Sequence, residues 1–180
     1  NPLFAMSSVK YALALHPARK LPKLVSQRLS VWFKRRPARA EPGEMGTVVV
    51  MNDVFTEYYE PYIGKSVIEV LEHIGYAVKL SPCWPSMRML VSHGLLDEAT
   101  VVARQALDWL KEHAADAQAV VGIEPSELLA YREEVLDLPL GELHLVTARE
   151  VAAKARLFDE ILADTLPQLQ GSYFDSNNRP

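Results

Sequence analysis

Short apolar runs alternate with longer amphipathic segments through most of the chain, from about residue 47 to residue 166. Runs of four or five mainly β-branched residues, each bounded by polar or turn residues, are typical of buried strands. Such runs predict strands at three places: 47–52, 76–80 and 119–123. Residues 142–146 form a fourth and weaker candidate strand.

The segments between these runs carry apolar residues at the spacing of amphipathic helices. The predicted helices are 61–73, 95–115, 127–135 and 148–166, with loops at 81–94 and 136–141. Ser126 and Thr147 are candidate N-caps for the last two helices. Strands that alternate with helices imply parallel pairing with right-handed crossovers. The prediction is therefore an α/β fold of three layers, with a small parallel sheet of three or four strands between flanking helices.

The first 40 residues follow a different pattern, which predicts a basic helical arm in front of the sheet. A short helix is expected over residues 7–15, and a second over residues 22–36 with Trp32 and Phe33 on its apolar face. Pro and Gly then mark a linker. The chain is thus divided into four parts: a connecting segment (1–40), a linker (41–46), an α/β domain (47–167) and a flexible tail (168–180).

Composition limits the classes of protein that fit. The chain is 49% hydrophobic and 23% charged, which indicates a globular protein. No apolar run approaches the roughly 18 residues of a membrane span. The single cysteine, Cys83, excludes an internal disulfide framework. It also excludes an iron–sulfur cluster or thiolate zinc site held by this chain alone, because such sites need several cysteine ligands.

Charge is distributed unevenly along the chain. Residues 1–40 carry nine Lys and Arg and no acidic residue, whereas residues 41–180 carry ten basic and 23 acidic residues, a net of −13. A basic arm on an acidic body indicates a segment that docks on something anionic. An acidic surface of the same protein is the favoured target, an anionic membrane surface is a second option, and we expect no nucleic-acid partner.

Polar residues follow each of the first three predicted strands, where open α/β sheets bind their ligands. Asp53 follows the first strand, Arg88 lies in the loop after the second, and Glu124 and Glu127 follow the third. We take these four residues as the candidate wall of a site. Arg88 could hold an anion or pair with Glu124 or Asp53, and the pairing is favoured. No Gly-rich phosphate loop occurs, so dinucleotide or ATP binding is not expected.

Two other chemistries receive less support. Acidic residues and one histidine after these strands could form an oxygen and nitrogen metal site: Asp53, Glu57, His93, Glu124 and Glu127. Acidic residues at helix starts are, however, explained by the helix dipole alone. Cys83 with His93 could form a nucleophile, but a lone cysteine beside Pro and Trp is typical of packing. We therefore predict no metal ligand and no catalytic residue in this chain.

Three stretches together resemble a known family: FTEYYEPYIGKSVIEVLEHIGYAV (55–78), SMRMLVSHGLLDEATVVARQAL (86–107) and VVGIEPSELLAYREEVLDL (120–138). They resemble the cysteine-rich (CCG) domain that is found in heterodisulfide reductase and in the iron–sulfur component of glycolate oxidase. The likeness is greatest to fused FAD-linked oxidases that act on D-lactate-type 2-hydroxy acids. LHPARKLPKLVSQRLSVWF (15–33) also resembles the segment that joins the ferredoxin-like and cysteine-rich parts of those oxidases.

Each repeat of that family carries cysteines at three places. By the resemblance, these places fall at Asp53–Val54, at Pro85–Ser86 and at Glu127, and Arg88 matches the arginine that follows the cysteine pair. This chain has no cysteine at any of them, and Cys83 is out of register with the pair. The resemblance therefore implies a first, cysteine-depleted repeat, with the ligands carried by a second repeat downstream.

The resemblance implies electron transfer from a flavin to an acceptor within a larger oxidoreductase. Because the chain begins with Asn1, we expect it to be a piece of a longer polypeptide. FAD and a 4Fe-4S cluster would be bound by the ferredoxin-like, flavin and second cysteine-rich parts, which are the expected partners, and this fragment would not be active alone.

We expect a cytoplasmic protein, with association at the inner face of the membrane through the basic arm as an option. Two alternatives remain open: a free-standing, non-catalytic interaction module and a small anion-binding α/β domain.

Overall fold

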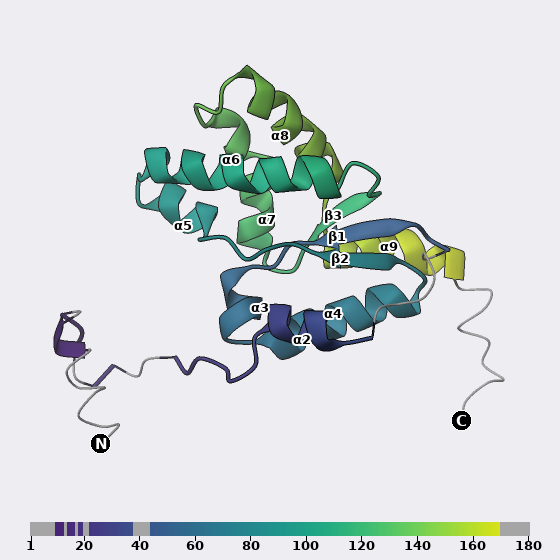
Figure 1. Cartoon of the computed structure of the whole chain (residues 1–180), viewed down its shortest axis with the longest axis horizontal. Coiled ribbons are helices and arrows are strands. Elements are labelled where there is room, and N and C mark those ends of the chain that lie inside the picture. The colour runs from purple at the N-terminus through teal and green to yellow at the C-terminus, as the bar shows by residue number, and fades with distance from the viewer. Residues whose placement is uncertain (1–9, 13, 17, 20–21, 38–43, 170–180) are drawn as a thin grey trace.

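A computed structural model describes residues 10–12, 14–16, 18–19, 22–37 and 44–169. A parallel sheet of four strands, in the order β2-β1-β3-β4, lies between two layers of helices (Figure 1). The strands are β1 (Thr47–Val50), β2 (Ala77–Leu80), β3 (Ala119–Gly122) and β4 (Ala155–Leu157). The predicted fold class is thus confirmed: three layers, with a small parallel sheet and flanking helices.

Helices cover both faces of the sheet, as Figure 1 shows. One layer contains α5 (Met87–Ser92), α6 (Leu96–His113), α7 (Pro125–Arg132), the short 3-10 helix η1 (Glu134–Asp137) and α8 (Glu142–Lys154). The other contains α2 (Leu29–Arg35), α3 (Val54–Tyr58), α4 (Pro61–His73) and α9 (Phe158–Leu169).

The sheet divides the core in two because successive strand residues face opposite sides. Val49 and Val120 belong to the core under α6, α7 and α8. Val48, Val50 and Val121 belong to the core under α2, α4 and α9. All five are fully buried, which explains why these strands appear in the sequence as continuous apolar runs and not as alternating patterns.

The fourth strand does not lie where the sequence predicts it. Residues 142–146 begin α8, and β4 interrupts the predicted helix 148–166. Three residues are too few to break a helical periodicity, and β4 is defined only by its pairing with β3, in which Ala155 lies opposite Val120. Thr147 lies inside α8 and caps nothing.

Side-chain caps move two other predicted boundaries. The predicted loop 81–94 contains α5, and Ser86 begins this helix because its Oγ accepts a hydrogen bond from Met89 N at 3.0 Å. The helix predicted to begin at residue 127 begins two residues earlier. Its cap is Glu124, whose carboxylate accepts a hydrogen bond from Ser126 N at 3.2 Å, so Ser126 is not the cap.

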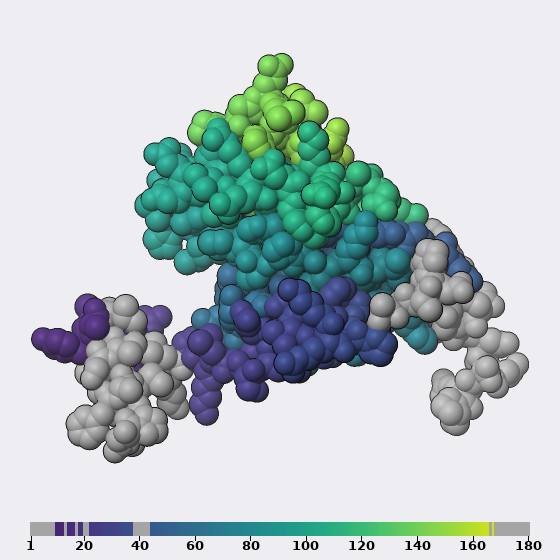
Figure 2. All heavy atoms as spheres, viewed as in Figure 1, coloured from purple at the N-terminus to yellow at the C-terminus, as the bar shows by residue number. Residues whose placement is uncertain are grey.

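The basic arm is helical over a shorter range than predicted. Of residues 22–36, only those of α2 form a helix, because Val25 N donates to Tyr58 O (3.0 Å) and holds the preceding segment in another conformation. α2 packs along α4 (Figure 2), and Arg36 pairs with Glu72 at 2.6 Å. The described part of the arm thus meets acidic groups of the same protein, the target that the charge pattern favours.

The predicted short helix at 7–15 is helical at residues 10–12. Residues 7–9 and 13 of that helix, 41–43 of the linker and 170–180 of the tail lie outside the described residues. No helix within the described ranges combines the length and the hydropathy needed to cross a membrane.

An ion pair fixes the start of α9 against α7. The guanidinium of Arg132 contacts the Glu160 carboxylate through two hydrogen bonds, of 2.5 and 3.1 Å, and Glu160 also accepts a hydrogen bond from Leu157 N at 2.8 Å. These bonds, that from Arg132 above all, lower the pKa of Glu160 to about 2.

We expect part of the acid sensitivity of this protein to come from Glu160. Its pKa of about 2 in the folded protein lies below the ordinary 4.5, so its contribution to stability is present above pH 4.5 and is lost as the pH falls toward 2. Glu160→Gln should be less stable than wild type at about pH 7 and should approach it at about pH 2.5. Urea unfolding at both pH values checks this. A stability difference between Glu160→Gln and wild type that is as large at about pH 2.5 as at about pH 7 would contradict this assignment.

Candidate functional site

The carboxyl end of β1 leads directly into Asp53, the first of the predicted wall residues. Its carboxylate accepts hydrogen bonds from Phe55 N (2.8 Å), Thr56 N (2.9 Å) and Thr56 Oγ1 (2.9 Å). Asp53 is therefore the N-cap of α3, a helix that the sequence analysis did not predict. The residue lies at the expected edge of the sheet and caps a helix there.

Glu57 is a buried carboxylate of α3 that joins this edge to the arm. It accepts hydrogen bonds from Ser30 N (2.9 Å), Ser30 Oγ (2.6 Å) and Asn52 Nδ2 (2.9 Å). Arg28 Nε lies 3.9 Å away, so a positive charge faces the carboxylate. From the sequence, Glu57 was a candidate metal ligand or an acidic residue that favours a helix start. Its role at the start of α2 depends on a residue 27 positions away and leaves no local signal.

Glu127 lies on α7, next to the loop that follows β2. Its Oε1 accepts a hydrogen bond from Ser86 Oγ. Burial raises the pKa of Glu127; the Ser86 hydrogen bond lowers it, and the carboxylates of Asp53 and Glu124 raise it again. Two other predicted wall residues, Asp53 and Glu124, are thus close enough to Glu127 to raise its pKa.

A small pocket of about 20 Å³ lies between these elements, with room for roughly one water molecule. Its polar lining comes from Asn52, Asp53 and Glu127, and its apolar lining includes Val54, Trp84 and Pro85. Among the described residues, buried Asn52 Oδ1 has no hydrogen-bond partner. Carboxylate and carbonyl oxygens therefore make this pocket electronegative.

The side chain of Arg88 does not pair with the other wall residues, although the backbone N–H of Arg88 donates to the Glu127 carboxylate. The side chain pairs with Glu134 of η1. The predicted partners were Glu124 and Asp53, so the prediction of the partner is wrong. The cause is the unpredicted helix α5, which packs against α7 and brings Arg88 to the segment that follows it. The sequence could not indicate this pairing, because η1 lies in a stretch predicted as helix and loop.

The described residues hold no group of three or more His, Cys, Asp or Glu arranged for a metal ion. His93 ends α5, where its ring nitrogen contacts Met89 O at 2.7 Å. Glu124 uses its carboxylate for the start of α7, where Ser126 Oγ also donates to it at 2.8 Å. These two candidate ligands thus interact with the ends of their own helices.

Cys83 lies beside the pocket and is half-buried. Burial raises the pKa of its thiol to about 12, with further contributions from the carboxylates of Glu57, Asp53 and Glu127. A thiol with this pKa is neutral near neutral pH and is therefore a poor nucleophile. The electrostatics therefore favour the packing role that the sequence suggested.

We expect Cys83 to react with thiol reagents at least about tenfold more slowly than an exposed cysteine at about pH 8, because its raised pKa leaves much less of the reactive thiolate. Glu127→Gln should speed the reaction by removing one nearby carboxylate, whereas Glu98→Gln on α6 should not. Stopped-flow absorbance with a disulfide reagent measures both. A rate equal to that of an exposed thiol would contradict the assigned environment.

Helix starts at this edge are already supplied with acceptors from the chain itself. Asp53 caps α3, Ser86 caps α5 and Glu124 caps α7. An anion that approached these N-termini would compete with these caps and meet the charge of two carboxylates. The geometry thus disfavours the anion-binding alternative.

Sequence comparison finds relatives of one name. The chain is 28% identical over 141 residues to a D-2-hydroxyglutarate dehydrogenase of Pantoea ananatis, a match that covers 78% of this chain and 13% of the relative. It is 30% identical over 112 residues to the enzyme of that name from Escherichia coli, and this match covers 61% of this chain and 11% of the relative. The Pseudomonas putida protein of that name is 28% identical over 122 residues, and this match covers 68% of this chain and 11% of the relative.

The match therefore spans little more than a tenth of each of these relatives. No family profile matches the chain. No solved structure matches it either.

Proposed function

We propose that this chain is part of an FAD- and iron–sulfur-dependent oxidoreductase that oxidises a D-2-hydroxy acid, and that it forms a cysteine-depleted repeat with a structural role. The similarity to D-2-hydroxyglutarate dehydrogenases over most of the chain carries the proposal. It points to D-2-hydroxyglutarate as the substrate of the whole protein in place of the D-lactate type suggested by the family resemblance. We place that protein in the cytoplasm, with the remainder of the oxidoreductase as partner.

Three places that carry cysteines in the resembled family come together in the fold, which supports the proposed repeat. Asp53, Val54, Pro85 and Glu127 all line the same small pocket. Ser86, beside Pro85, donates a hydrogen bond to Glu127. Residues from three separate segments would meet in this way if the pocket derives from a ligand site whose thiols were replaced by a carboxylate and a hydroxyl.

The residues present do not fit an iron–sulfur cluster. Such clusters are held by cysteine thiolates. The pocket offers carboxylate and amide oxygens within about 20 Å³, and the neighbouring Cys83 has a thiol pKa of about 12. We therefore assign this chain no step in electron transfer. Its carboxylates would form an electronegative wall, and the anionic substrate is expected to bind elsewhere in the protein.

The gene product that contains this chain tests the proposal directly. Its reading frame should encode FAD-binding, ferredoxin-like and second cysteine-rich sequences. The purified protein should show a flavin spectrum that D-2-hydroxyglutarate bleaches and the L-enantiomer does not. A reading frame without those sequences would overturn the proposal, as would a flavoprotein that the D-acid leaves oxidised.

An interaction module without redox activity is the second candidate. The observation that favours it is an exposed apolar groove between α4, β3 and β4, lined by residues such as Val70 and Leu157. Intact protein purified without iron or flavin, but with a bound protein, would support this candidate over the first.

A further inference from the structure

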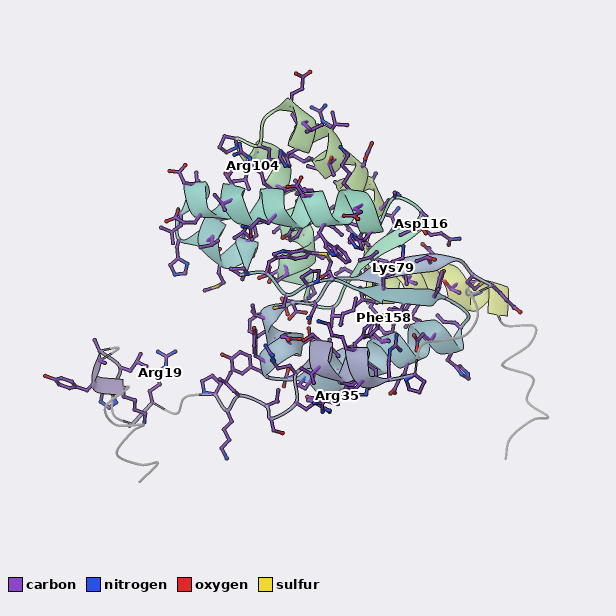
Figure 3. The ribbon with its side chains drawn as sticks, viewed as in Figure 1. Arg19, Arg35, Lys79, Arg104, Asp116 and Phe158 are labelled. Atoms are coloured by element: carbon purple, nitrogen blue, oxygen red, sulfur yellow. The ribbon has the colours of Figure 1, made fainter. Side chains whose placement is uncertain are left out.

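A groove of about 560 Å³ opens between α4 and the carboxyl ends of β3 and β4. Phe158, one of its lining residues, lies between the sheet and α4 in Figure 3. Most of the lining is apolar and includes Tyr62, Val67, Val70, Ile123, Leu157 and Phe158. Tyr62 is 63% exposed and Val70 41% exposed, so large apolar side chains face solvent along one wall. Apolar surface of this kind in a groove is typical of a binding site.

Carboxylates surround this apolar surface. Asp159 lines the groove, Glu60 accepts a hydrogen bond from the hydroxyl of Tyr62 (3.3 Å), and Glu124 precedes Pro125 of the lining. Within the described ranges, none of these three carboxylates forms an ion pair. Glu124 also caps α7, so Glu60 and Asp159 are the rim carboxylates that are available to a cationic partner.

The basic residues closest in sequence are engaged with other groups. Arg132 is held by Glu160. Arg156 donates to the carbonyl oxygens of Ala153 and Ala155. Lys65 donates to Gln27 of the arm. Among the described residues, none of these three cations therefore forms an ion pair with a carboxylate of the rim.

We propose that this groove binds an amphipathic helix of a partner polypeptide, with the apolar face of the helix in the groove and Lys or Arg residues on its flanks. Helices bind grooves of this kind through apolar anchors at three- and four-residue spacing. Basic flanks would meet the acidic rim, which provides the charge complementarity that selects one partner over another. The inference rests on the groove alone and not on the proposed redox function.

The same charges argue against other occupants. An anionic membrane surface would be repelled by the rim carboxylates. A second copy of this acidic groove would bring like charges together. A small ligand would need convergent polar groups inside the cavity to orient it, and the groove lining offers chiefly Ser66 and Asp159 for that purpose.

Two labelled synthetic peptides of equal length test the proposal. Both carry leucines at the same helical positions. The remaining positions are lysines in one peptide and glutamates in the other. Fluorescence anisotropy with the full chain measures their binding. The lysine peptide should bind at least about tenfold more tightly than the glutamate peptide, and the difference should shrink as salt is added. Equal binding of the two peptides, or no binding of either, would overturn the proposal.

Matched variants locate the binding surface. Val70→Ser, and the pair Glu60→Gln with Asp159→Asn, should each weaken binding of the lysine peptide about fivefold or more. Val101 of α6 is 53% exposed and lies in the opposite layer, so Val101→Ser is the control for Val70. The double variant Asp97→Asn with Glu98→Gln, in the first turn of the same helix, is the control for charge. Equal weakening by the control variants would place the peptide elsewhere and overturn the proposal.

Discussion

Replacement of Leu29 by Ala is expected to lower the free energy of unfolding by about 3 kcal/mol, the usual cost of a large-to-small change in a core. Leu29 is the one fully buried side chain among the described residues of the arm, and it belongs to the core under α2 and α4. Equilibrium urea unfolding followed by circular dichroism measures the change. Leu24→Ala is the control, because Leu24 lies in the same arm and is 68% exposed.

Gly64 of α4 explains why Leu29 fits so closely. A Cβ atom at position 64 would lie 2.4 Å from Leu29 Cδ2, so Gly64→Ala should destabilise the wild-type protein by about 1–2 kcal/mol. In a Leu29→Ala background the same change fills space and improves helix propensity, so it should stabilise by about 0.5–1 kcal/mol. A Gly64→Ala effect of the same sign in both backgrounds would contradict direct contact between arm and helix.

Replacement of Glu57 by Gln is expected to cost about 2–4 kcal/mol, because a buried carboxylate that accepts three hydrogen bonds loses its charge. The amide nitrogen of Gln would also face the Ser30 or Asn52 donors. Denaturant unfolding measures the loss. Glu69→Gln, on the exposed surface of α4, should change stability by less than about 0.5 kcal/mol.

Loss of the Glu57 bonds should also loosen the arm before the rest of the protein unfolds. Ser30 N and Oγ both bind Glu57, so the first turn of α2 depends on that carboxylate. Limited digestion with trypsin should then cut faster after Arg35 in Glu57→Gln than in wild type, under conditions where β1 to β4 remain protected. Unchanged digestion of the arm would show that other contacts hold α2 in place.

Glu57 therefore couples two regions that the sequence presents as separate. Through Asn52 Nδ2 it contacts the end of β1 and the lining of the small pocket, and through Ser30 it contacts the arm. A change in the position of the arm would alter the hydrogen bonding of Asn52.

The sequence alone was sufficient to predict the α/β class, the first three strands and the long helices α4 and α6. These elements are continuous apolar or amphipathic segments whose periodicity extends over enough residues to be recognised locally. It also placed Asp53, Glu124 and Glu127 at one edge of the sheet, because the carboxyl ends of parallel strands must lie together. Nothing more than the order of elements is needed for that inference.

The elements and contacts that depend on distant partners could be identified only in the folded chain. β4 is a strand because β3 lies beside it, and its three residues carry no pattern of their own. Arg88 pairs with Glu134, 46 positions away. Glu57 accepts a hydrogen bond from the backbone of Ser30 in the first turn of α2, 27 positions before it. A side chain of opposite charge is available at many positions of an acidic chain, and packing alone selects among them.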